Sequence, residues 1–193
     1  MKLVLPCRNS DEGEDYITKE YLAYKLYEVI TPYHFKTRML HIDYADVKKR
    51  KDKIYELRGF LIEDISKEAK RNDGKRLKNK VHPLEQDAFA AIQNDFFQFL
   101  IGNTDFSSTN QHNEKLIYLK GNDAIIPIPY NFDMSGLVDA SYAVVSQVQG
   151  EVLDITSVRQ RLYRGVMRDP NIYEEVRQHY LSKRKTALRL LMN

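Results

Sequence analysis

The chain has little of several residue types that point to particular protein classes. Its 193 residues include one cysteine, no tryptophan, 8 glycines and 6 prolines. The single cysteine, Cys7, forms no internal disulfide and has no cysteine or histidine at zinc-binding spacing. The low glycine and proline content argues against a collagenous or low-complexity chain. A folded globular domain, or a pair of small lobes, is therefore the class that remains.

Long apolar runs are absent as well. No window approaches the roughly 18 apolar residues that a membrane span requires, and the stretch from Met1 to Cys7 is too short for a secretory signal. We therefore expect no membrane span and a cytoplasmic location for the chain as given. A lost N-terminal segment would leave the location open.

Positive charge is gathered locally, although the net charge is only +3, from 30 Lys and Arg against 27 Asp and Glu. Such clusters are ordinarily solvated surfaces. They also attract polyanions, but no aromatic residues alternate with them as a stacking platform for nucleic acid. Nucleic-acid association is therefore a lower-ranked alternative. The clusters comprise Lys48, Lys49, Arg50, Lys51 and Lys53; Lys67, Lys70, Arg71, Lys75, Arg76, Lys78 and Lys80; and Arg177, Lys183, Arg184, Lys185 and Arg189.

Local patterns predict an α+β order of helices and antiparallel hairpins. Acidic residues from Asp11 precede apolar residues at helical spacing up to Pro32, which indicates a helix. Asn72-Asp73-Gly74 is typical of a turn in which Gly or Asn takes a positive φ. The other expected elements are a strand at 2–6, a hairpin of strands 35–44 and 54–62, helices at 65–71 and 84–101, a hairpin of strands 116–119 and 124–128, and helices at about 155–168 and from 170 onward.

Two polar segments flank the second hairpin and suggest phosphoryl transfer. That reaction uses a carboxylate near the attacking hydroxyl, together with an Asn and a second Asp that hold Mg²⁺. On this hypothesis Asp105 orients or deprotonates the acceptor, Asn113 or Asn110 binds the metal, and Asp133 is its main carboxylate ligand. The hairpin between the two segments would bring them together in space.

Each of these residues also has an ordinary structural interpretation. Asp105 and Asp133 could cap turns or helices, Lys2 could be an exposed lysine, and Glu20 a helix-surface acid. Order and spacing across all the sites favour the functional hypothesis. Tyr142, Tyr163 and Arg164 are interpreted as packing and surface residues.

At these residues the chain resembles atypical protein-kinase-like proteins. Asn103-Thr104-Asp105, followed by residues 112–116, is similar to the catalytic loop of HipA-type and CotH-type kinases, and Tyr130-Asn131-Phe132-Asp133-Met134-Ser135-Gly136-Leu137-Val138 is similar to their metal-binding segment. The pattern is most similar to that of uncharacterised bacterial proteins with an Ile-Gly-Asn-Thr-Asp loop, a His-Asn-x-Lys strand start and a Tyr-Asp-Phe-Asp-x-Ser-Gly-Leu-Val block.

The resemblance implies an α+β protein-kinase-like fold. A truncated antiparallel small lobe with one helix would occupy residues 1–64, and a mainly helical large lobe residues 65–193. Lys2 would contact the nucleotide phosphates and Glu20 would pair with it, while backbone groups near Glu63 and Asp64 would meet adenine. The cofactors implied are ATP and Mg²⁺, and the acceptor is a hydroxyl on a protein or small molecule.

The chain also departs from the family pattern. Asp105 and Asn113 are eight residues apart where protein kinases have five; Asn110 obeys the usual spacing, but Asn113 immediately precedes the strand. Asn131 stands where an Asp is expected. Only Met1 precedes Lys2 in the sequence given, so we expect the strands that cover the nucleotide to be missing. This predicts either a fragment of a longer protein or a chain with weakened or lost activity. The alternative is a pseudokinase-like interaction module. Strand faces left exposed by the missing strands would favour pairing with a second copy of the chain.

Overall fold

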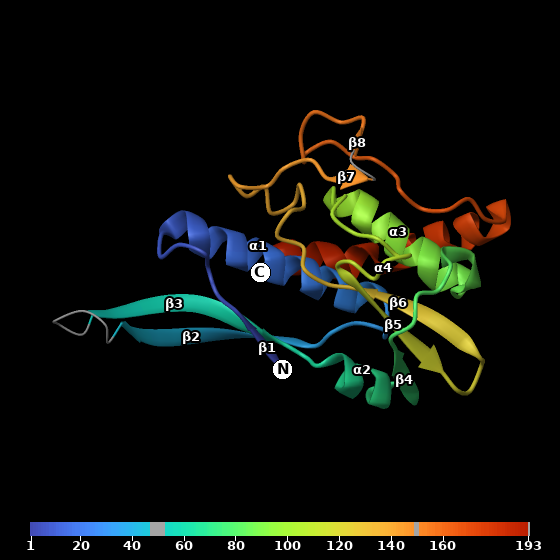
Figure 1. Ribbon diagram of the computed structural model, residues 1–193, viewed down its shortest axis with the longest axis horizontal. Helices are drawn as coiled ribbons and strands as arrows, with labels where there is room; N and C mark the ends of the chain where they lie inside the picture. Colours follow the sequence, from blue (N-terminus) through green and yellow to red (C-terminus); the bar gives the residue numbers. More distant parts are fainter. Residues whose placement is uncertain (47–52, 149–150, 193) are drawn as a thin grey trace.

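The structure is a computed structural model that describes residues 1–46, 53–148 and 151–192. Its described part is an α+β fold with two three-stranded antiparallel sheets, a two-stranded hairpin and four α-helices. Figure 1 shows helix α1 (Asp11–Ile30) lying along the first sheet, with helices α3 (Ala88–Ile101) and α4 (Pro170–Met192) packed nearby. The expected α+β class is confirmed.

Helix α1 follows directly from local sequence signals. The Ser10 side chain caps the helix by accepting a hydrogen bond from the Gly13 backbone N–H (3.2 Å). Three acidic residues occupy the first turn, where the helix dipole favours them. The helix ends at Ile30, just before Pro32. The predicted helix is confirmed at both ends.

The first sheet has the order β1-β3-β2, with every pair antiparallel. It is formed by β1 (Lys2–Val4), β2 (Thr37–Asp46) and β3 (Lys53–Ile62). The register pairs Ile62 with both Lys2 and Thr37, so the end of β3 lies in the middle of the sheet. The predicted hairpin is confirmed. Lys48, Lys49, Arg50 and Lys51 of the first basic cluster lie outside the described residues.

The second sheet contains a strand that the sequence did not indicate. Its order is β4-β5-β6, formed by β4 (Gly74–Leu77), β5 (Glu114–Leu119) and β6 (Ala124–Pro129). Helix α2 (Ile65–Arg71) leads into β4 and matches its prediction. In the turn between them Asp73, rather than Gly or Asn, has the positive φ of 54°. The lysine-rich stretch after the turn forms a strand because it pairs with the apolar β5.

Helix α3 starts later than predicted. Leu84 lies in the short 3-10 helix η1 (Pro83–Glu85), and α3 begins at Ala88 because the Asp87 side chain caps it through the Ala90 backbone N–H (2.9 Å). Its end at Gly102 is as predicted.

The predicted helix at 155–168 is wrong. Within the described residues, the chain between the small hairpin of β7 (Gln147–Val148) and β8 (Glu151–Val152) and helix α4 is irregular. The Val158 backbone carbonyl lies so close to Gly136 that a Cβ there would approach it to 2.3 Å. Arg164 and Arg168 donate to backbone carbonyls of other segments. Tertiary contacts of this kind override a local helical pattern.

An aromatic core connects the elements that carry the candidate site. Tyr24 of α1 contacts Phe60 of β3 and Phe132 after β6, with ring centroids 5.6 and 4.8 Å apart. Phe97 of α3 contacts Phe132 at 5.6 Å and also Tyr27. The chain after β6 is thereby held against α1. None of the described helices is both long and apolar enough to cross a membrane.

Candidate active site

The loop that carries Asp105 begins where α3 ends. Gly102 closes the helix with a φ of 67°, which glycine adopts without a steric penalty. The buried Asn103 side chain donates to Gln98 Oε1 (2.8 Å) and accepts from the Asp105 backbone N–H (3.0 Å). These bonds fix the backbone of Asp105 immediately after the helix.

Asn113, at the other end of this loop, is bonded directly to Asp105. Its Nδ2 donates to the Asp105 carbonyl oxygen (2.7 Å) and to carboxylate Oδ2 (2.8 Å). The other carboxylate oxygen, Oδ1, lies 3.1 Å from His112 Nε2. Asn110 is exposed instead and accepts a hydrogen bond from Lys80 Nζ (2.9 Å). Of the two candidate asparagines, Asn113 is therefore the one beside Asp105.

The turn after β6 joins this pair to helix α1. Asn131 donates from its side chain to Asn113 Oδ1 (3.3 Å) and from its backbone to the Tyr24 hydroxyl (2.8 Å). Its φ of 63° is left-handed, a conformation that asparagine tolerates better than most residues. The next backbone N–H, that of Phe132, donates to Glu20 Oε1 (3.3 Å). The segment 131–133 thus bridges the Asp105 loop and α1.

Asp133 supplies the carboxylate of this turn, and one of its two carboxylate oxygens has no hydrogen-bond partner. Its Oδ1 is buried and accepts no hydrogen bond. Burial raises the pKa of Asp133, and the nearby Asp105 carboxylate raises it further, while Tyr142 and the Met134 backbone act in the opposite direction. An unpartnered buried carboxylate oxygen close to a second carboxylate is the arrangement expected where a cation binds.

Glu20 lies beside Asp133 from the α1 side. Its side chain is almost fully buried, and burial, then Asp133, raises its pKa to about 7. The Phe132 backbone and, most weakly, Lys2 oppose the shift. Lys2 is exposed on β1, and no ion pair within 4.0 Å joins it to Glu20. The predicted pair is therefore near but not in contact.

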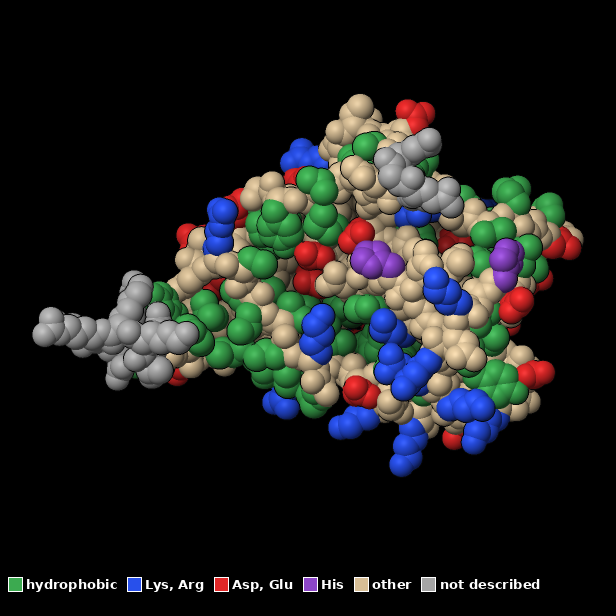
Figure 2. Space-filling model, viewed as in Figure 1, with side chains coloured by type: hydrophobic (Ala, Val, Ile, Leu, Met, Phe, Trp, Pro, Cys, Tyr) green, Lys and Arg blue, Asp and Glu red, His purple; other side chains and the backbone are tan. Residues whose placement is uncertain are grey.

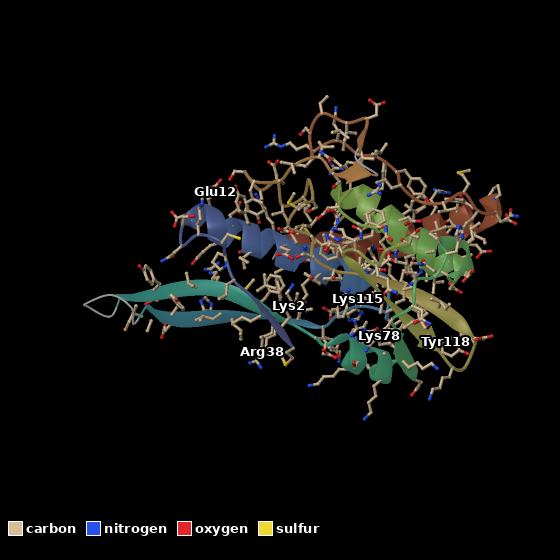
Figure 3. The ribbon with its side chains drawn as sticks, viewed as in Figure 1. Lys2, Glu12, Arg38, Lys78, Lys115 and Tyr118 are labelled. Atoms are coloured by element: carbon tan, nitrogen blue, oxygen red, sulfur yellow. The ribbon has the colours of Figure 1, made fainter. Side chains whose placement is uncertain are left out.

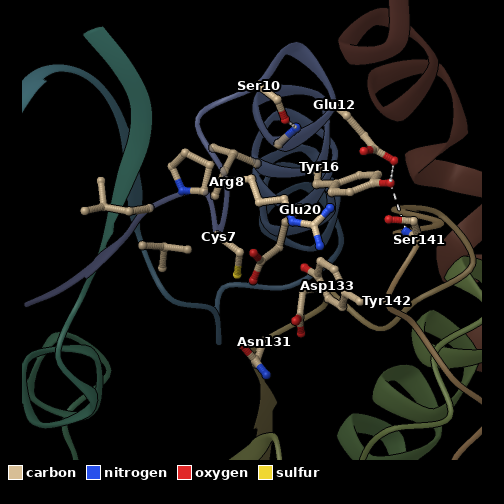
Figure 4. A pocket seen from close by; sticks show the side chains of 15 residues that line it. Cys7, Arg8, Ser10, Glu12, Tyr16, Glu20, Asn131, Asp133, Ser141 and Tyr142 are labelled. Carbon is tan, nitrogen blue, oxygen red and sulfur yellow. Dashed lines mark hydrogen bonds between the residues drawn. The ribbon is translucent and has the colours of Figure 1, made fainter. Parts of the chain in front are cut away.

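A cavity of about 460 Å³ opens next to these carboxylates. Residues 4–8, the first half of α1 and the 131–142 segment line it. Figure 4 shows the Glu20 and Asp133 side chains together on its wall, with Tyr142 beside Asp133. Tyr142, interpreted from the sequence as packing, is therefore part of the site. Lys2 and Asp105 do not line this cavity.

Glu63 and Asp64 lie away from the cavity and make structural contacts. The Glu63 backbone N–H donates to the Lys36 carbonyl (2.9 Å), and its carboxylate accepts from Arg71 (3.0 Å). Asp64 caps α2 through the Ser66 backbone N–H (2.8 Å), which lowers its pKa. The structure does not bring these two residues to the Asp133 cluster.

Sequence reasoning missed the role of Arg164 in holding the Asp105 loop. Its guanidinium donates to the carbonyls of Thr104 and Phe106, the two neighbours of Asp105, and lies 5.1 Å from the Phe106 ring centroid. Because both bonds go to backbone carbonyls 58 and 60 residues away in sequence, no local pattern could have indicated them.

The oxygen atoms of Asp133, which lines the cavity, and Asn113, which does not, are of the kind that magnesium binds. Asp133 offers a carboxylate oxygen and Asn113 an amide oxygen, both hard ligands of the kind that Mg²⁺ prefers. Across residues 1–46, 53–148 and 151–192, no group of three or more His, Cys, Asp or Glu side chains could hold a metal alone. Mg²⁺ usually keeps waters and uses few protein ligands together with substrate phosphates, which fits a small protein contribution.

Comparison with known proteins gives no match: no protein-family model, no curated protein and no solved structure corresponds to the chain.

Proposed function

We propose that the chain is an ATP- and Mg²⁺-dependent phosphotransferase of the atypical protein-kinase-like class, acting on a hydroxyl of a protein or small molecule. The observation that carries the proposal is that Asn113 is bonded to Asp105 and, through Asn131, to the turn that carries Asp133, with Glu20 beside Asp133. Phosphoryl transfer depends on positioning and charge neutralisation rather than on covalent chemistry by the protein. These residues would supply the positioning, and a Mg²⁺ ion held by them would supply the neutralisation.

The roles follow from the contacts. Asp105, held by Asn113 and His112, would accept or orient the acceptor hydroxyl proton through its carboxylate. Asp133 and Asn113 would hold Mg²⁺, which when bound neutralises charge on the nucleotide phosphates. Glu20 would orient Lys2 toward the phosphates once the two approach. The adenine contact near Glu63 has less support, because that backbone N–H already has a partner.

The strand order also supports the kinase-like proposal. The strand with the candidate lysine, β1, pairs with β3, which leads directly into the candidate hinge, and α1 with its glutamate packs on the same sheet. These are the relations that the resemblance requires between the lysine strand, the glutamate helix and the hinge. One observation favours the second candidate, a pseudokinase-like interaction module: Lys2 and Glu20 form no ion pair, although active kinases require one.

Calorimetric titration of ATP with and without MgCl₂ tests the proposal. We expect the wild-type chain to bind ATP only with Mg²⁺, and Asp133→Ala to weaken binding at least about 100-fold, the scale on which a lost charged contact acts. Asp43→Ala, which changes an exposed aspartate on β2, is the matched control and should bind as wild type does. Thermal unfolding checks that both variants fold.

Three outcomes separate the alternatives. Equal binding by Asp133→Ala would remove Asp133 from the site, and no binding by the wild-type chain would contradict the nucleotide proposal. Mg²⁺-dependent binding without transfer of phosphate to water or to a hydroxyl acceptor would favour the pseudokinase-like module.

A further inference from the structure

Helix α2, strand β4 and the residues that follow them carry six exposed basic side chains, which we name together the α2–β4 basic surface. Figure 2 shows Lys and Arg side chains gathered over α2 and β4, and Figure 3 labels Lys78 there. All six are exposed, and among the described residues none forms an ion pair within 4.0 Å. The surface consists of Lys67, Lys70, Lys75, Arg76, Lys78 and Lys80.

Acidic residues of the same segment do little to neutralise this surface. Between residues 64 and 80 the exposed acids are Asp64 and Asp73, two against six cations. Glu68 is fully buried, and its burial raises its pKa to about 8, so it is largely uncharged at neutral pH. Arg71 is already paired with Glu63. Neighbouring unpaired like charges repel each other, and an acidic partner would relieve that repulsion.

The surface is connected to the loop that carries Asp105. Gln111 Nε2 donates to the Asn79 carbonyl oxygen (2.7 Å), and Lys80 Nζ donates to Asn110 Oδ1 (2.9 Å). Lys78 and Lys80 therefore flank Asn79, whose backbone carbonyl is hydrogen-bonded to the 103–113 loop. A partner lying along α2 and β4 would be led to the candidate acceptor position.

The composition of the surface favours a polypeptide over a nucleic acid. Single-stranded nucleic acid is bound through aromatic stacking platforms, but the nearby Tyr118 ring has Lys75 Nζ over its face at 5.2 Å from the centroid. Five of the six side chains are lysines, whose ammonium groups are point charges without the planar fork of arginine. Flexible point charges of this kind suit carboxylates on an extended peptide.

We propose that the α2–β4 basic surface binds an acidic polypeptide segment and, resting on the proposed function, that this segment presents the acceptor hydroxyl to Asp105.

Fluorescence anisotropy with a labelled peptide in which Glu and Asp flank one Ser tests the proposal without nucleotide. We expect saturable binding that weakens as salt rises, and at least about tenfold weaker binding of the Gln/Asn version. The triple variant Lys75→Glu/Lys78→Glu/Lys80→Glu should weaken binding at least about tenfold. The control Arg184→Glu/Lys185→Glu/Arg189→Glu, with the same charge change on exposed residues of α4, should bind as the wild-type chain does.

The outcomes are decisive in either direction. The proposal would be overturned if the acidic peptide did not bind, or if both triple variants lost binding equally. Tighter binding of single-stranded DNA of equal charge would also overturn it, because the surface would then be assigned to nucleic acid. Asp133→Ala should still bind the peptide. Peptide binding without ATP binding would therefore leave the surface intact while removing the proposed function, and ATP binding without peptide binding would do the reverse.

Discussion

Glu63 and Asp133 are two acids that the kinase resemblance assigns to one nucleotide site, Glu63 through its backbone, and the structure gives their side chains opposite surroundings. The Glu63 carboxylate accepts from Arg71 (3.0 Å) and from the Lys36 backbone N–H (3.1 Å), and only 13% of its side chain is exposed. Asp133 has a buried oxygen without a partner, near Glu20 and Asp105. A satisfied carboxylate stabilises the fold, whereas an unsatisfied one costs stability and is retained where it has a function.

The largest expected effect concerns pH, because acids with raised pKa values make the fold less stable as they ionise. At pH values between the pKa of such a carboxyl group in the unfolded chain and its higher pKa in the folded chain, the unfolded chain has lost the proton and the folded chain still holds it. The free energy of unfolding therefore falls as the pH rises. We expect the free energy of unfolding to decrease by several kcal/mol between about pH 5 and about pH 8, at about 1.4 kcal/mol per pKa unit and group. The acids responsible have pKa values of about 7 to 8: Glu20, Glu68, Asp95 and Glu114.

Urea unfolding at a series of pH values measures this slope. Glu114→Gln, at a fully buried position whose carboxylate accepts from Asn94 and Ser108, should reduce it. Stability that stays constant or rises over this range would contradict the assignment of unfavourable burial to these acids.

The next largest effect is expected at the satisfied carboxylate. Glu63→Gln removes the charge that faces Arg71, whose side chain is 25% exposed, and should lower the free energy of unfolding by about 2 kcal/mol. Chemical unfolding at constant pH measures it. Glu174→Gln is the matched control because Glu174 pairs with Arg177 on the exposed face of α4, and its loss should cost much less than that of Glu63. Equal small effects would show that Glu63 contributes no more than a surface pair.

The smallest effect has the opposite sign. Asp133→Asn removes the negative charge from the carboxylate whose buried oxygen has no partner. We expect the free energy of unfolding to rise by about 1 kcal/mol at about pH 8, a value already reduced because water screens part of the Asp133 charge. The measurement is made without Mg²⁺ or ATP, with Asp43→Asn on exposed β2 as control. A loss of stability like that of Glu63→Gln would mean that Asp133 is a structural residue.

The elements that were predictable are those specified by local sequence. Helix α1, both long hairpins, α2 and the end of α3 at Gly102 each follow from caps, turns and spacing within a few residues. Strand β4 was missed because only its partner β5 makes it a strand. The irregular 155–168 segment was missed because its conformation depends on contacts with Gly102, Gly136 and the Asp105 loop.

The candidate site was predictable in its residue types and order but not in its partnerships. The sequence indicates Asp105, Asn113 and Asp133, and the hairpin between them brings Asn131, two residues before Asp133, to Asn113. It does not distinguish Glu63, which has a partner in Arg71, from Asp133, which has an unpartnered oxygen. That distinction depends on which side chains lie nearby in space, and a single sequence does not record it.

The bond from Arg164 to the Thr104 carbonyl also gives the Asp105 loop a contact that can form only late in synthesis. The two residues are 60 positions apart in sequence, so closing this contact carries a large entropic cost that local helices and hairpins avoid. During synthesis the Asp105 loop would leave the ribosome long before Arg164 does. Until Arg164 is available, Asp105 is held by the local bonds of Asn103 and Asn113, and a chain that ends before Arg164 lacks the long-range contact.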